Sequence, residues 1–366
     1  MSGTTTTRMI SAYNQEMAQP TLFLSGLFQS PQQNFHSSEE VEFDIVRSDE
    51  DISVAIQDLS TGYRMNSEDL YTNKGFKPPI YKEAISINSF DLLKRMPGQN
   101  PFESPDFRAN VITRMFNGMT KIERKIRRSI EVQASQVLQT GKVTLTDAGG
   151  NPLYEIDYQP KASHFPAAGT SWATATGSEK IQDINNLAEE IRNDGLADPD
   201  QLIMGVEAFN NFVSDDEIQK RFDSRRLDLG TFVPMEMRGN GGNFRGVVEI
   251  GNYSYDVWTY GGRYKDPQTG NRVQYLNPDS VIVRASSGRL DATFGAVPNI
   301  GALMGGSSND LLPELPNRMS NSQGGMDLFT NAWLSEDKTQ LFAGVAARPL
   351  MIPTAIDTFG CLDAQT

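Results

Sequence analysis

The sequence predicts an α+β fold that is organised around one long helix. Residues 104–140 carry apolar side chains at spacings of three and four, which is the period of an α-helix. Runs of alternating apolar and polar residues flank this segment on both sides, as expected for half-buried strands. Beyond residue 177, helical periods and short apolar runs follow one another, which predicts a second unit of mixed α and β structure.

The predicted long helix has a start signal, a stop signal and an apolar face. Ser104 is a preferred N-cap residue, Pro105 suits the first helical position, and Gly141 favours a stop. At 1.5 Å per residue, the helix would be a rod of roughly 50 Å. The residues of its apolar stripe are Val111, Met115, Met119, Ile122, Ile126, Ile130, Ala134 and Val137.

The helix also carries a basic stripe and an internal glycine. The stripe lies nearly opposite the apolar face and consists of Arg114, Lys121, Lys125 and Arg128. Taken alone, such a stripe is typical of a solvated helix face. Gly118 stands in the helix interior, where glycine costs about 1 kcal/mol relative to alanine. It predicts either a bend point or a position where a neighbour packs too closely for a side chain.

The chain before the helix contains an arm, an apolar cluster and a long loop. Residues 1–20 are polar and without periodicity, which is typical of a mobile arm. Alternation predicts strands at 39–47 and 82–95, and the roughly thirty irregular residues between them predict a long projecting loop or hairpin. A loop of this length needs a role, such as gripping a neighbour. We expect the apolar cluster to form a short helix that docks on the body or on a partner. The cluster consists of Leu22, Phe23, Leu24, Leu27 and Phe28.

The chain after the helix begins with a predicted hairpin at residues 142–158. A linker rich in Pro, Ala, Gly and Thr follows and ends near residue 177. A helical period then predicts a helix from Ser178 to Gly195, followed by a short buried strand at 201–204. Residues 348–361 suit an extended run that ends beside the first domain.

The composition argues against several classes of function. The chain of 366 residues carries a net charge of −13, so any contact with nucleic acid must be local. Its one cysteine, Cys361, excludes an internal disulfide and any multi-cysteine metal site. No apolar run approaches the ~20 residues of a membrane span, and the N-terminus lacks the apolar core of a signal peptide. We therefore expect a soluble protein that is made in the cytoplasm.

Residues for catalysis or metal binding are scarce. The two histidines, His36 and His164, both stand in polar, turn-like segments, so we expect them in surface loops. The chain therefore has too few histidines to favour a histidine-based catalytic triad or metal site. The acidic cluster at residues 215–217 is interpreted as a helix start, where acids favour the dipole, rather than as a metal site. We predict no catalytic residue, no metal and no cofactor.

The order of these elements resembles the major capsid proteins of tailed bacteriophages. The family it resembles is the phage lambda major capsid protein (major capsid protein E) family, which has the Hong Kong 97-type fold. The resemblance is collinear across nearly the whole chain, although the glycine-rich segments 238–246 and 305–325 depart from the family pattern. The segments that carry it are TLFLSGLFQS, EEVEFDIV, SPDFRANVITRMF, IRRSIEVQASQVLQTGKVTL, Leu202–Asp223 and RPLMIPTAIDTFG.

The resemblance implies a Hong Kong 97-like capsid fold with five parts. These are an N-terminal arm (1–37), an extended β loop with flanking strands (38–97), a peripheral domain with the spine helix (104–140) and the hairpin (98–177), an axial α/β domain (178–347) and a terminal strand that returns to the peripheral domain (348–366). In this arrangement the basic stripe is expected to face the shell interior, with its packaged DNA, or the acidic residues of a neighbouring subunit. Gly118 would let the spine bend in the procapsid.

The resemblance also implies a function and a set of partners. The chain would be a major capsid protein that assembles into the pentamers and hexamers of an icosahedral shell around double-stranded DNA. Assembly would take place in the host cytoplasm and mature through a procapsid, and the product would be the virion capsid. The implied partners are further copies of the chain, a separate scaffold protein and a portal. A decoration protein is left open, contact with DNA would be non-specific, and no membrane is involved.

Two alternatives stand beside this interpretation. An encapsulin-like compartment shell would share the fold but hold cargo enzymes instead of DNA. A cytoplasmic enzyme with a long helical arm would need a convergent set of titratable residues, and the sequence offers only scattered carboxylates.

Overall fold

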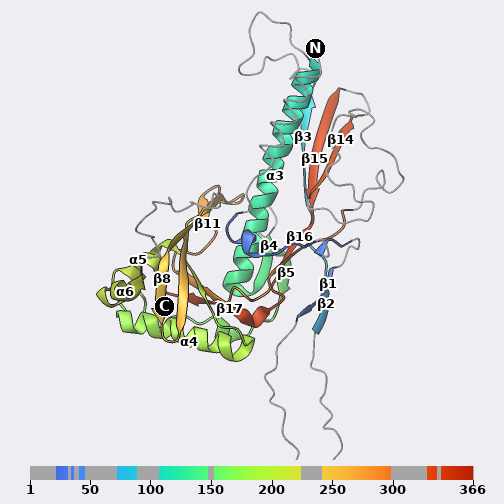
Figure 1. Ribbon diagram of the computed structural model, residues 1–366. Helices are drawn as coiled ribbons and strands as arrows, with labels where there is room; N and C mark the ends of the chain where they lie inside the picture. The colour runs from blue at the N-terminus through green and yellow to red at the C-terminus, as the bar shows by residue number, and fades with distance from the viewer. Residues whose placement is uncertain are drawn as a thin grey trace, which may run out of the picture.

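One helix, α3, runs from Phe107 to Thr140, and the other elements are arranged along it (Figure 1). A three-stranded sheet lies beside its N-terminal part, and a larger sheet with covering helices lies at its C-terminal end. The α+β class predicted from the sequence is therefore confirmed. The computed structural model describes residues 22–31, 34–36, 41–45, 72–88, 107–146, 152–223, 241–297, 328–335 and 339–365.

The long helix forms where its apolar period predicts it. From Met115 to Val137, every residue of the predicted apolar stripe is buried, whereas Val111 is partly buried. The helix ends because Gly141 adopts a left-handed conformation with φ of 65°, and its N–H donates to the Val137 carbonyl at 2.8 Å. The predicted start signals at residues 104 and 105 lie outside the described residues.

The largest sheet has six strands, and it supplies most of the second unit. The pairing of β6 with β9 is parallel, and the other pairings are antiparallel. In order across the sheet, the strands are β17 (Phe359–Asp363), β12 (Ser280–Arg284), β6 (Gln201–Met204), β9 (Tyr253–Tyr260), β8 (Gly242–Ile250) and β7 (Phe222–Asp223).

Three helices accompany this sheet, and one of them begins earlier than predicted. They are α4 (Gly177–Gly195), α5 (Val206–Val213) and α6 (Asp216–Arg221). The cap of α4 is Thr176 rather than Ser178, because Thr176 and Glu179 form a reciprocal capping box. Asp215 Oδ1 accepts the N–H of Glu217 at 2.9 Å at the start of α6, as its interpretation as a helix-start residue requires.

The three-stranded sheet lies against α3 through its edge strand β3. Gln133 Nε2 donates to the Tyr81 hydroxyl at 2.9 Å, and the side chain of Ile85 contacts Gly118. The strand therefore runs along the helix in the opposite direction. The strands are, in order, β14 (Phe329–Leu334), β15 (Gln340–Ala347) and β3 (Tyr81–Asn88).

The strand pairing around the extended loop differs from the expectation. The strands predicted at 39–47 and 82–95 do not enclose one irregular segment, because Val41–Ile45 pairs with Thr72–Phe76 instead. The sequence of this second strand, TNKGF, is mostly polar and contains residues that are rare in strands, so the sequence did not predict a strand there. The two-stranded pairs are β1 (Val41–Ile45) with β2 (Thr72–Phe76), β4 (Lys142–Thr146) with β5 (Pro152–Asp157), β10 (Arg263–Lys265) with β11 (Arg272–Gln274), and β13 (Asp291–Phe294) with β16 (Pro349–Ile352).

The C-terminal segment contacts both parts of the fold. Strand β16 pairs with β13 and lies against α3, whereas β17 pairs with β12 at the edge of the six-stranded sheet. Because one short segment contributes strands to both parts, these contacts do not define where one domain ends and the next begins, and the domain boundaries stay a prediction. Short 3₁₀ turns connect several segments, and they are η1 (Ser25–Leu27), η3 (Ala162–His164) and η4 (Ile356–Thr358).

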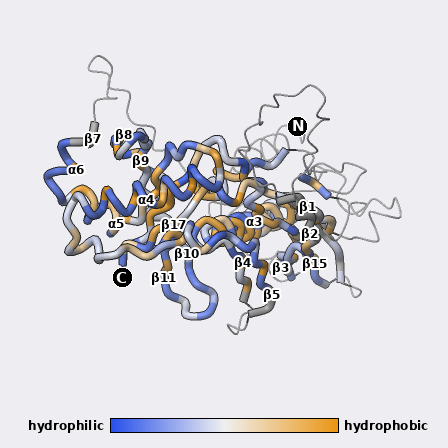
Figure 2. The backbone as a smooth tube through the Cα atoms, turned by 90° about the horizontal axis from the view of Figure 1, so that it is seen from below, coloured by the Kyte–Doolittle hydropathy of each residue, from blue (hydrophilic) through white to orange (hydrophobic). Residues whose placement is uncertain are grey.

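Two hydrophobic clusters form the core. The larger one surrounds α3 and includes residues of β15, β16 and the segment near residue 24, whereas the smaller one lies between the six-stranded sheet and α4 and α5. Figure 2 shows the hydrophobic parts of the backbone gathered around α3 and beside α4, with hydrophilic parts at the periphery.

Candidate assembly site

The apolar cluster near the N-terminus is docked on the body of its own chain. It forms the single turn η1, and Phe23, Leu24 and Phe28 are buried in the larger core cluster. Leu22 and Leu27 are partly buried against the same cluster. Because the segment is too short to be a stable helix by itself, this packing must hold it in place.

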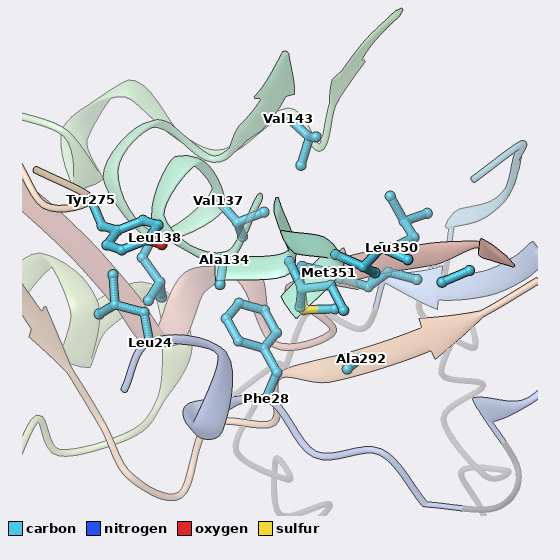
Figure 3. Packing of buried hydrophobic residues seen from close by; sticks show 14 of the residues in the cluster. Leu24, Phe28, Ala134, Val137, Leu138, Val143, Tyr275, Ala292, Leu350 and Met351 are labelled. Carbon is cyan, nitrogen blue, oxygen red and sulfur yellow. The ribbon is translucent and has the colours of Figure 1, made fainter. Parts of the chain in front are cut away.

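The buried members of this segment contact both α3 and the strands around it. Phe23 packs on the aromatic side chains of β9, with its ring centroid 5.4 Å from that of Tyr260. Figure 3 shows Leu24 beside Leu138 and Tyr275, and Phe28 beneath Ala134. The segment therefore joins the long helix to the second unit of the fold. We call residues 22–28 the anchor.

A buried carboxylate completes the anchor. Glu131 lies on α3 with no exposed surface. Its Oε1 accepts the Leu24 N–H at 2.9 Å and the Tyr260 hydroxyl at 2.7 Å. Its Oε2 accepts the Ser25 N–H at 2.8 Å. Burial and the neighbouring Glu131 raise the pKa of Tyr260, so the tyrosine stays a hydrogen-bond donor.

The sequence analysis missed Glu131, although the sequence contains a signal for it. The residue stands three positions before Ala134 and seven before Leu138, which places it on the same side of the helix as two buried residues. An acid at that spacing is unusual unless it has partners.

The chain continues from the anchor along β13. The Gln29 N–H donates to the Leu290 carbonyl at 2.8 Å, and the His36 N–H donates to the Phe294 carbonyl at 2.9 Å. Asn34 Nδ2 also donates to the buried Asp291 carboxylate at 3.1 Å. A second carboxylate therefore holds the segment that follows the anchor.

The basic stripe does not form one uniform surface. Lys121, Lys125 and Arg128 are exposed, whereas Arg114 is half-buried. Lys125 Nζ forms an ion pair with Glu83 Oε1 of β3 at 2.6 Å, so the same chain neutralises this part of the stripe. The acid partner was not predicted, because strand β3 and α3 are far apart in the sequence.

An open groove lies between the N-terminal part of the stripe and β3. Its volume is about 310 Å³, and the apolar side chains of Ile85 and Ile87 form one wall. Arg114, Lys121 and Gly118 line the opposite wall. The groove thus combines an apolar surface with two cationic side chains.

Gly118 lies where the helix packs closely on Ile85 of β3. A Cβ atom placed on Gly118 would overlap Cδ1 of Ile85 and come within 2.9 Å of its Cγ1. The helix is continuous through this position. These contacts favour the packing interpretation of Gly118, and bending during maturation stays a proposal.

His164 is not in a surface loop, contrary to the expectation. It is 1% exposed, its Nδ1 lies 2.9 Å from the Phe359 carbonyl oxygen, and its Nε2 lies 3.1 Å from Asp194 Oδ2. Partial burial opposes ionisation of Asp194, but hydrogen bonds from Lys161 and His164 outweigh it and lower its pKa. His36 is half-buried beside β13, and burial lowers its pKa.

The described residues offer little to catalysis. Across the described ranges, no group of three or more His, Cys, Asp or Glu side chains could hold a metal ion. Burial raises the pKa of the Cys361 thiol to about 12, which suppresses its thiolate form. None of the helices in the described part of the chain is long and apolar enough to cross a membrane.

Comparison with protein families decides between the alternatives. A family model described as phage major capsid protein E matches residues 5–360. The chain belongs to the phage major capsid protein E family. It is therefore a structural capsid protein of phage virions and not an enzyme, and the resemblance stated from the sequence is confirmed.

Solved structures show the Hong Kong 97-like fold for this capsid protein. A protein described as the capsid protein of a prophage in E. coli CFT073 aligns with a TM-score of 0.62 and 18% identity over 98% of each chain. The capsid of Ralstonia phage GP4 aligns with a TM-score of 0.48 and 10% identity, over 93% of this chain and 84% of the other chain. The SrpI encapsulin of Synechococcus elongatus PCC 7942 aligns with a TM-score of 0.40 and 11% identity, over 91% of this chain and 86% of the other chain. The fold assignment rests on the alignment with the prophage capsid protein. A comparison with curated proteins found no match.

Proposed function

We propose that this capsid protein forms the pentamers and hexamers of an icosahedral shell that encloses the double-stranded DNA of a tailed phage. The observation that carries the proposal is the family match over residues 5–360. Each contact between subunits can be modest, because a closed shell sums many of them.

The β1–β2 pair supports the proposal that an extended loop grips a neighbour. Residues 46–71 connect its strands at Ile45 and Thr72. A two-stranded hairpin is at best marginally stable in water, so a covering partner would stabilise it. Figure 1 shows the pair away from the N-terminal turns of α3, toward the edge of the molecule.

The division into parts follows the same proposal. Residues 1–37 would be the arm, 38–97 the extended loop and 98–177 the peripheral domain. Residues 178–347 would form the axial domain that gathers at the centres of pentamers and hexamers, and 348–366 the terminal segment. The contact of β16 with α3 supports the return of the terminal segment to the peripheral domain. Strands β3 and β15 also contact α3, although this division assigns them to the extended loop and to the axial domain.

The proposed partners are further copies of the chain, a separate scaffold protein and a portal, while a decoration protein stays open. Assembly would take place in the host cytoplasm. Of the three exposed residues of the basic stripe, Lys121 and Arg128 would face packaged DNA or acids of a neighbouring subunit. Lys125 contributes less charge to such contacts, because Glu83 already pairs with it.

Electron microscopy of the expressed chain, with and without a co-expressed scaffold protein from the same genome, tests this proposal. We expect closed icosahedral particles, with a portal and DNA when the phage supplies both. Protein that stays monomeric under both conditions would contradict it. Closed shells filled with an enzyme cargo and lacking a portal would favour the compartment alternative instead.

A further inference from the structure

The chemistry around Glu131 fits a carboxylate and no other group. Its three neighbours, the N–H groups of Leu24 and Ser25 and the Tyr260 hydroxyl, are all donors. An ionised carboxylate has two acceptor oxygens and no proton, so it satisfies all three. An amide would present its own N–H₂ group to at least one of these donors. Hydrogen bonds to an ionised acceptor are also roughly twice as strong as neutral ones.

A buried charge at this point needs compensation. Among the described residues, the three donors are the hydrogen-bond partners of Glu131, and no lysine or arginine forms an ion pair with it. Removing a carboxylate from water is costly unless its lone pairs are satisfied. If packing alone were needed here, an apolar side chain would serve better. The buried carboxylate with its three donors therefore points to a role in holding the anchor.

The contact fixes the anchor in position and in direction. Two successive peptide N–H groups bind the two oxygens of one carboxylate, which restrains the orientation of the backbone at Leu24 and Ser25. The side chains of Phe23 and Leu24 are buried in the core next to this contact. The anchor therefore has one defined position beside α3.

The same carboxylate reaches the second unit of the fold. Tyr260 belongs to β9 of the six-stranded sheet, and its ring also packs on Phe23. One side chain of α3 thus joins the anchor, the helix and the sheet.

We propose that Glu131 is an anchor-positioning residue: it locks the anchor onto α3 and β9. The lock itself is a contact within one chain. It stands whether or not the shell has the proposed pentamers and hexamers.

Hydrogen–deuterium exchange of the full-length protein, with Glu131→Gln beside the unchanged chain, tests the lock. We expect exchange in peptides covering residues 22–31 to rise at least tenfold. We also expect chymotrypsin to cut after Phe23 or Phe28 at least tenfold faster, because these rings leave the core. Exchange at residues 115–130 should stay unchanged, which a general loss of stability would not allow.

Two further variants keep the test sharp. Glu123→Gln is the matched control, since Glu123 is a buried acid on the same helix that pairs with Arg127 instead. Tyr260→Phe removes one donor, keeps the ring on Phe23, and should raise exchange of the anchor by less than Glu131→Gln does. It also serves as the test if Glu131→Gln does not fold.

The outcomes separate clearly. A local rise for Glu131→Gln, a smaller one for Tyr260→Phe and none for Glu123→Gln would support the proposal. Equal effects of the two glutamine variants, a rise spread evenly over the chain, or no change with Tyr260→Phe would overturn it.

Discussion

Lys125 of α3 and Glu83 of β3 form an ion pair, with Nζ and Oε1 2.6 Å apart, on the surface between the long helix and the three-stranded sheet. The pair is exposed, with 61% of the lysine side chain and 41% of the glutamate side chain accessible. It reduces the charge that the basic stripe can offer to DNA or to a neighbouring subunit.

The exposed pair should contribute little to stability. Lys125→Ala and Glu83→Gln are each expected to change the free energy of unfolding by less than about 1 kcal/mol, because solvent and salt screen exposed pairs. A double-mutant cycle by urea denaturation in low and high salt measures the coupling. A coupling above 2 kcal/mol that persists in high salt would contradict this account.

Gly118 should not tolerate a side chain while Ile85 is present. Gly118→Ala is expected to destabilise the protein by about 1–3 kcal/mol, since the new methyl group overlaps Ile85. Ile85→Ala in the same chain should relieve the overlap, so that the double variant is more stable than the two single effects predict. Thermal denaturation of the four proteins checks this.

The same variant also separates the two interpretations of Gly118. If Gly118→Ala with Ile85→Ala assembles and expands normally, the bend proposal fails and packing alone explains the glycine. If the double variant is stable but its shells do not expand, bending at Gly118 is required.

The anchor should contribute strongly to stability through its buried rings. Phe23→Ala is expected to cost about 3–5 kcal/mol, as large-to-small changes in a core do. Leu27→Ala, at a partly buried position of the same turn, should cost less. Equal losses for the two variants, measured by chemical denaturation, would be inconsistent with the packing described.

Asp194 should make stability depend on acid pH. Its pKa is lowered in the folded protein by hydrogen bonds from Lys161 and His164, which outweigh partial burial. The unfolded chain therefore binds more protons near its ordinary pKa of about 3.9, and the contribution is present above that value. It is lost as the pH falls through the lower folded pKa. Melting temperatures of the unchanged chain and of Asp194→Asn between pH 3 and 7 should converge at the acid end.

The helical period and the turn signals made much of this fold predictable from the sequence. The buried stripe of α3 and the pairing of β4 with β5 follow from local patterns, because each of these segments carries its own period. The burial of Phe23 and Phe28 followed from their apolar clustering.

Features that depend on distant partners were not predictable. The pairing of β1 with β2, the burial of His164 against Phe359, and the three donors at Glu131 each join residues far apart in the chain. A single sequence gives no register for such pairs. The domain boundaries and the role of the basic stripe stay predictions, because they too depend on contacts with distant residues or with other subunits.

The central claim is that this chain builds a closed phage shell, and cryo-electron microscopy of particles from cells that express it tests that claim most directly. We predict icosahedral particles in which α3 and the six-stranded sheet of each subunit can be fitted as described, with residues 46–71 covering a neighbouring subunit. Particles of another symmetry, or protein that never forms closed shells even with its scaffold protein present, would contradict it.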